Sequence, residues 1–219
     1  MLTFKDVKSN ETIRTYIQRA DECLIALGYT EHSFAHVTHV AETAGYILKT
    51  LGYPERTVEL VKIAAFLHDI GNAVNRSRHA EYGGILAYSI LKQTDMPLKD
   101  AITVMTAISN HDESTGGAVD AISAALIIAD KTDVRRNRVR TKEQTAFDIH
   151  DRVNYAVTDS HLRMDAANKI ISLNLQIDES ICTMYDYFDI FLVRMQMCRH
   201  AAGVLGAVFK LTVNGSKVL

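Results

Sequence analysis

Histidines and carboxylates recur in five short fragments within the first 130 residues of the chain. The fragments are His36, His68-Asp69, His79, His111-Asp112 and Asp130. Imidazole nitrogens and carboxylate oxygens suit hard or borderline divalent ions such as Mn, Fe, Mg or Zn, and one carboxylate can bridge two ions. If the fold brings the fragments into one cavity, they would form a buried metal cluster that activates water. Metal-assisted hydrolysis is therefore the first chemistry that these residue types indicate.

Helices are expected to position these side chains. Apolar residues recur at helical spacing from residue 1 to about residue 135, and the pattern is interrupted at four places. The breaks fall at Gly28, Gly52 to Pro54, Gly71-Asn72 and Met96-Pro97. We predict an all-α bundle over residues 1–140.

Most of the candidate ligands fall at the ends of the predicted helices. His68-Asp69 ends an apolar helix where Gly71 stops it, and His79 begins the next helix. Asp130 ends the nearly continuous apolar segment that begins at Ala118, where an unpaired buried carboxylate would be costly. A cation is the partner that such a carboxylate needs.

The pattern of apolar residues in the sequence changes after Asp130. Residues 153–158 and 170–177 alternate with period two and predict strands, and a last alternating stretch covers residues 207–213. A helix from about Ser180 to Arg199 lies between the second and third of these stretches. The fold is predicted to be mainly α, with a small ββαβ layer over residues 141–219 packed on the bundle.

Composition limits the classes of function. The 24 basic and 26 acidic residues give a formal net charge of -2, so the chain as a whole has no charge that favours duplex nucleic acid or an anionic membrane. The three cysteines lie far apart without CxxC spacing, which disfavours a disulfide framework and a thiolate zinc site. Neither a signal peptide nor an apolar run of membrane-spanning length is visible. We expect a cytoplasmic protein.

The order H, HD, D, together with the segments LHDIGN at 67–72 and ALIIADKTD at 125–133, resembles the HD superfamily of metal-dependent phosphohydrolases. The resemblance covers roughly residues 30 to 140 and implies the HD-domain helical bundle. It also implies a first ion on His36, His68, Asp69 and Asp130, and a second on His79 and His111, bridged by Asp69. His32, one helical turn before His36, is a candidate further ligand.

The set H-HD-H-H-D is similar to the binuclear branches of that superfamily, which include the HD-GYP cyclic-dinucleotide phosphodiesterases. The sequence departs from HD-GYP at several points. Asn72 stands where that pattern places lysine, Asn110-His111-Asp112 replaces His-His-Glu, and the GYP tripeptide is missing between Ser114 and Asp120. These departures disfavour hydrolysis of cyclic di-GMP and leave the substrate open.

We therefore predict a phosphohydrolase that cleaves a phosphate ester of a nucleotide or another small phosphorylated metabolite with a metal-activated hydroxide. Two divalent ions are expected, and Mn, Fe, Mg, Zn, Ni and Co are not distinguished. Besides Asp69, Lys131 and Asp112 are the candidate catalytic groups. Arg135, Arg76 and Arg78 are the candidate phosphate-binding side chains, because arginine suits bidentate phosphate contacts.

Two other classes of function stay open. A similar ligand set carrying mixed-valence iron would make a di-iron HD-type oxygenase, and a structural or absent metal would make a non-catalytic regulatory or ligand-binding module. A homodimer formed through edge strands of the C-terminal layer is a further alternative.

Overall fold

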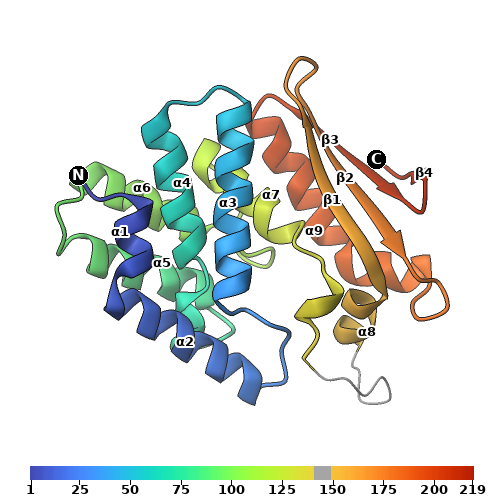
Figure 1. Ribbon diagram of the computed structural model, residues 1–219, viewed down its shortest axis with the longest axis horizontal. Coiled ribbons are helices and arrows are strands. Elements are labelled where there is room, and N and C mark those ends of the chain that lie inside the picture. Colours follow the sequence, from blue (N-terminus) through green and yellow to red (C-terminus); the bar gives the residue numbers. More distant parts are fainter. Residues whose placement is uncertain (141–148) are drawn as a thin grey trace.

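The computed structural model describes residues 1–140 and 149–219, and it shows a helical bundle with a small sheet beside it (Figure 1). The bundle consists of α1 (Phe4–Ser9), α2 (Glu11–Ala26), α3 (Phe34–Thr50), α4 (Glu55–Leu67), α5 (His79–Leu91), α6 (Leu98–Ser109) and α7 (Ala121–Lys131). A short 3-10 turn, η1 (Ile70–Ala73), connects α4 to α5. The predicted all-α character of this region is confirmed, and each predicted break separates two of these elements.

Local sequence explains where these helices begin and end. Asn10 and Ser33 cap α2 and α3 with their side chains, because each accepts a hydrogen bond from a free backbone N–H of the first turn. Asp120 forms a capping box with Ser123 at the start of α7. Gly28, which follows α2, has a φ of +80°, a conformation that favours glycine.

The C-terminal part contains the predicted ββαβ order with one short strand added. Its elements are the 3-10 turn η2 (Arg136–Arg138), α8 (Ile149–Ala156), β1 (Val157–Asp165), β2 (Ile170–Ile177), α9 (Met184–Val204), β3 (Val208–Val213) and β4 (Ser216–Lys217). The sheet order is β1-β2-β3-β4, with β2 and β3 parallel and the other two pairs antiparallel. Helix α9 makes the connection between the parallel strands, as such a pair requires.

The first predicted strand, residues 153–158, begins too early. Residues 153–156 belong to helix α8, and β1 begins only at Val157. Val153 and Ala156 are both buried, and their separation of three residues fits one face of a helix. A window of six residues is too short to distinguish this spacing from strand alternation.

Helix α9 lies between the bundle and the sheet, where it contacts α7 on one side and β3 on the other (Figure 1). The buried apolar residues form one cluster that extends from Phe4 in α1 to Val213 in β3. The boundary between bundle and layer is predicted between residues 140 and 141. It adjoins residues 141–148, which lie outside the described residues, so this boundary stays a prediction.

None of the described helices is both long enough and apolar enough to cross a membrane. Cys23, Cys182 and Cys198 are free thiols.

Candidate metal centre

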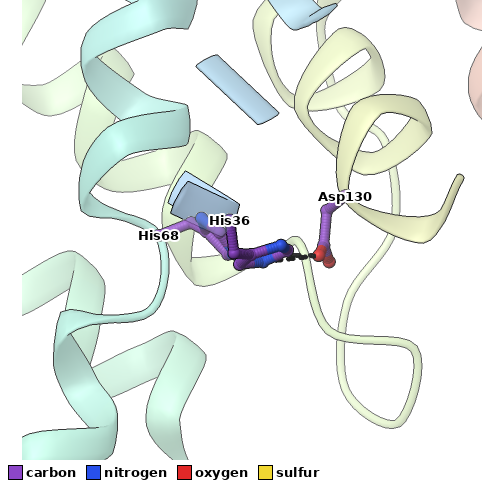
Figure 2. Close-up of side chains that lie close together, drawn as sticks. All are labelled: His36, His68 and Asp130. Atoms are coloured by element: carbon purple, nitrogen blue, oxygen red, sulfur yellow. Dashed lines mark ion pairs between the residues drawn. The ribbon is translucent and has the colours of Figure 1, made fainter. Parts of the chain in front are cut away.

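Three helices bring His36, His68 and Asp130 together at the centre of the bundle (Figure 2). His36 comes from the first turn of α3, His68 directly follows α4, and Asp130 is in the last turn of α7. The Oδ1 atom of Asp130 lies 3.5 Å from Nε2 of His36 and 3.7 Å from Nε2 of His68. One ligand atom from each residue lies within 4.8 Å of the others, so a single ion could contact all three.

A second group of ligand atoms adjoins the first and consists of His68, Asp69 and His111, again within 4.8 Å of one another. His79 completes it, with Nε2 located 3.2 Å from Nε2 of His111 and 3.7 Å from Oδ1 of Asp69. The other carboxylate oxygen of Asp69, Oδ2, lies 3.6 Å from Nε2 of His36. Asp69 thus presents one oxygen to each group, as a carboxylate that bridges two ions would.

The protein fixes the same tautomer for all four histidines. In each ring Nδ1 lies against an oxygen and donates a hydrogen bond to it. The acceptors are Asp133 Oδ2 for His36 at 2.7 Å, Ala65 O for His68 at 2.7 Å, Arg76 O for His79 at 3.0 Å and Ile108 O for His111 at 2.6 Å. A neutral ring that donates from Nδ1 keeps a lone pair on Nε2. Metal-binding histidines are oriented in this way by their outer partners.

The buried polar atoms of the centre lack the partners that a folded protein normally provides. Within the described part of the chain, Nε2 of His36, Nε2 of His68 and Oδ2 of Asp69 are buried and accept no hydrogen bond. The Nε2 lone pairs of His79 and His111 face each other at 3.2 Å, which is unfavourable without a positive charge between them. Burying such atoms without compensation is costly, and a divalent cation would satisfy all of them. The donor set therefore fits a metal centre.

The electrostatics of the site point in the same direction. Burial would lower the pKa of His68, but the carboxylates of Asp69 and Asp130 outweigh it and raise that pKa to about 10. Burial lowers the pKa of His111 to about 3, and the positive charges of His68 and His79 add to the effect. The carboxylates thus favour a positive charge at this position, where a metal ion would displace the proton of His68, whereas His111 is already neutral, as an imidazole ligand has to be.

Glycine and asparagine residues allow η1 to hold Asp69 in place. A Cβ on Gly71 would overlap the carbonyl oxygen of His79, so only glycine lets η1 approach the first turn of α5 so closely. Asn72 donates from Nδ2 to the carbonyl oxygen and to Oδ1 of Asp69, both at 2.9 Å. Asn72, one of the departures from the HD-GYP pattern, therefore orients the carboxylate that faces both groups.

A cavity of about 340 Å³ opens onto the centre. The candidate catalytic residues Lys131 and Asp112 line it, as do Arg76 and His32. The Oδ2 atom of Asp112 lies 3.6 Å from Nε2 of His79. Lys131 is paired with Asp130 at 2.9 Å and with Glu113 at 2.6 Å. Burial would lower the pKa of Lys131, but these two carboxylates raise it, so the ammonium group stays charged.

His32 lies beside the two groups but belongs to neither. Its ring centroid is 5.3 Å from that of His36, and its Nδ1 donates to the carbonyl oxygen of Thr30 at 2.7 Å. Burial holds the pKa of His32 well below its usual range. The ring is thus neutral and offers Nε2 to the cavity, and its role as a ligand stays a prediction.

Two of the three predicted phosphate-binding arginines are not at the cavity. Arg78 is an exposed residue that precedes α5. Arg135 pairs with Asp133 and lines a different depression that includes His39. The structure places Arg138 at the cavity instead, because η2 turns the chain between these two arginines.

Sequence reasoning missed three further residues around the centre. Asp133, at the end of the segment ALIIADKTD, holds His36, and its place three residues after Asp130 was a usable signal. Glu113 pairs with Lys131, and Arg194 pairs with Glu113. No local pattern could connect Glu113 with Arg194, because 81 positions separate them in the chain.

Comparison with known proteins agrees with this geometry. The family model of the HD domain matches residues 33–156, which is more than half of the chain and includes every residue of both ligand groups. An uncharacterized protein of Methanocaldococcus jannaschii is 27% identical over 173 residues, which cover 68% of this chain and 66% of the relative. Because this match covers more than half of the chain, the chain belongs to the HD-domain family.

Proposed function

We propose that the protein is a metal-dependent phosphohydrolase that uses two divalent ions to cleave a phosphate ester of a nucleotide or another small phosphorylated metabolite. One observation carries the proposal. Four imidazoles, each held at Nδ1 by an oxygen, direct Nε2 toward Asp69, which presents one oxygen to each ligand group. The residues that would hold the ions are His36, His68, Asp69, His79, His111 and Asp130. Bound divalent ions supply Lewis-acid chemistry, because they neutralise phosphoryl oxygens and lower the pKa of water.

The charges around the cavity make anion binding depend on the metal. Among the described residues, five carboxylates and four cationic side chains line it, so the protein alone gives the cavity no excess of positive charge. The cations are Arg76, Lys131, Arg138 and Arg194. Divalent ions would reverse the balance, so a phosphate ester should bind only after the metal.

The protein's own groups can handle the proton that a leaving alkoxide requires. Asp112 lies beside His79 and is held by the backbone N–H of Ser114 at 2.9 Å. We assign Asp112 as the carboxylate that takes a proton from the attacking water and passes it to the leaving alkoxide. Lys131 keeps its charge next to Asp130 and is assigned to orienting that carboxylate, since both of its partners are acidic.

The mouth of the cavity favours a substrate with a flat organic group. Arg76 lies over the ring of Tyr29, with its guanidinium carbon 5.0 Å from the ring centroid. Tyr29 and Leu27 line the cavity and are exposed large apolar residues. An aromatic side chain beside an arginine is a surface on which a nucleobase can stack. This feature supports a nucleotide as the substrate.

Metal-reconstituted protein tests the proposal directly. The metal-free chain is loaded with Mn or with Fe and is assayed for hydrolysis, followed as free phosphate for nucleotides and sugar phosphates and as the nucleotide products for cyclic nucleotides and dinucleoside polyphosphates. Oxygen consumption is recorded on the same samples. We expect hydrolysis with Mn and no oxygen uptake. Oxygen uptake by the Fe form without hydrolysis would favour the oxygenase, and metal binding without either activity would favour a regulatory module.

A further inference from the structure

Helix α9 of the C-terminal layer reaches the cavity that opens onto the candidate metal centre. Arg194, in the middle of α9, lines the cavity, and its Nε donates to Oε1 of Glu113 at 2.8 Å. The other oxygen of Glu113 pairs with Lys131, which in turn pairs with Asp130. A series of alternating charges therefore connects α9 to a metal-binding carboxylate.

Arg194 differs from the neighbouring cations in the number of its N–H groups that have no hydrogen-bond acceptor among the described residues. Arg138 donates from Nε and Nη2 to the carbonyl oxygen of Glu31, and from Nη1 to that of Asp133. Lys131 lies between two carboxylates. By contrast, neither Nη group of Arg194 donates a hydrogen bond to any residue in the described ranges 1–140 and 149–219. The cavity thus contains a guanidinium that is held at one nitrogen and has its other two available.

Glu113 gives this guanidinium a defined position. Lys131 lies on the other side of Glu113, so the carboxylate is held between two cations. The guanidinium carbon of Arg194 also lies over the ring of Phe191, 5.0 Å from its centroid. About 29% of the Arg194 side chain is exposed, so a molecule in the cavity can reach it. A guanidinium that is ordered in advance loses less freedom when it binds an anion.

We propose that Arg194 binds phosphoryl oxygens of the substrate through Nη1 and Nη2, with Glu113 as its positioning residue. The planar guanidinium matches two oxygens of a phosphate, whereas an ammonium is a point charge. The C-terminal layer would then complete the substrate site of the HD-domain bundle. This inference rests on the proposed function, because it takes a phosphate ester as the ligand.

The test measures binding of inorganic phosphate to the full-length, Mn-loaded protein by titration calorimetry, so that no turnover is needed. Arg194→Gln removes the charge, and Arg194→Lys keeps a charge that can still pair with Glu113 but lacks the planar pair of Nη donors. Arg199→Gln, at an exposed site on the same helix, is the matched control. Mn content and melting temperature are recorded for every variant.

We expect both Arg194 variants to weaken phosphate binding by about tenfold or more, since bonds to charged groups are the stronger class of hydrogen bond. Arg194→Lys should keep the melting temperature and Mn content of the control, and Arg199→Gln should bind phosphate like the wild type. Wild-type phosphate affinity in Arg194→Lys would overturn the assignment of the two Nη donors. Wild-type affinity in Arg194→Gln would overturn any contact with phosphate.

A double-mutant cycle tests the positioning role of Glu113. If Glu113 acts through Arg194, Glu113→Gln alone should weaken phosphate binding, and the double variant with Arg194→Gln should bind no worse than Arg194→Gln alone. Additive losses would contradict the positioning role.

The outcome of these binding tests can be distinguished from the outcome for the proposed function. Phosphate binding that needs Arg194 in a protein that hydrolyses no ester would keep this inference and remove the phosphohydrolase, whereas ester hydrolysis with no Arg194 dependence would do the reverse.

Discussion

Each histidine of the metal centre uses one ring nitrogen for a contact with the protein and leaves the other for a ligand. For His36 that contact is with a carboxylate, Asp133, whereas the other three donate to backbone oxygens. Asp133 is fully buried, and Arg135 and Arg138 pair with it as well. Burial would raise the pKa of Asp133, but His36 and the two arginines hold it well below its usual range. The carboxylate is therefore a charged acceptor that makes His36 a better metal ligand.

Asp133→Asn should weaken Mn binding by about 10- to 100-fold, because it removes the negative charge behind His36 while keeping the shape of the side chain. The change would be measured as the Mn dissociation constant of the purified variant. Asp159→Asn is the matched control, since Asp159 also pairs with a histidine, His161 at 3.0 Å, but on the exposed surface. Equal Mn affinities for the two variants would contradict the role given to Asp133.

At this scale the sequence predicted residue types better than contacts. His36, His68, Asp69, His79, His111 and Asp130 were recognised because their order forms a motif, and the structure brings all six together. The sequence did not predict which basic side chain lines the cavity, because that depends on how the backbone turns. Arg135 and Arg138 belong to one basic run, and only η2 determines that Arg138 lines the cavity while Arg135 lies elsewhere.

At the scale of elements, the close packing of η1 on α5 keeps the two ligand groups together. Gly71 allows the backbone approach to His79, and Gly83 lies against the carbonyl oxygen of His68 from the other side. This contact connects the helix end that carries His68 and Asp69 with the helix start that carries His79.

Gly71→Ala should therefore separate His79 from Asp69, lower the melting temperature and reduce the Mn bound per chain. A methyl group there would overlap backbone atoms of α5, which cannot move aside like a flexible side chain. Gly203→Ala in α9 is the control, because a Cβ there meets nothing within 4 Å and alanine favours a helix. The Mn content of both variants would be measured by elemental analysis. Equal Mn contents in Gly71→Ala and Gly203→Ala would refute this explanation.

The helices and their breaks were predictable because capping residues, glycine and proline act locally. The boundary between α8 and β1 was not, because it depends on contacts between distant parts of the chain. Val153 in α8 and Val157 in β1 are both buried, and so short a run of apolar residues does not show where the helix ends and the strand begins.

At the scale of the whole molecule, the metal centre is connected to both parts of the fold. The bundle supplies all six candidate ligands, and α9 reaches the same cavity through Arg194. Because three of the ligand atoms are buried without a hydrogen-bond partner, the folded state should bind divalent ions that the unfolded chain does not organise.

Mn should accordingly stabilise the protein. At a free Mn concentration of 100 times the dissociation constant, the free energy of unfolding should rise by about 2.7 kcal/mol per site. Thermal denaturation with Mn and with a chelator would measure this, and His36→Ala should lose much of the response. His161→Ala, a change of an exposed histidine, should keep the full response. A melting temperature that is independent of Mn would argue against a metal centre.

The central claim is that metal held by the buried His and Asp cluster hydrolyses a phosphate ester. The most direct test compares phosphate release by the wild type and by Asp69→Ala, both treated with Mn and assayed on the same ester. Asp69 faces both ligand groups, so its loss should disrupt both sites. We predict release by the wild type and none above background by the variant. Undiminished release by Asp69→Ala would contradict the account.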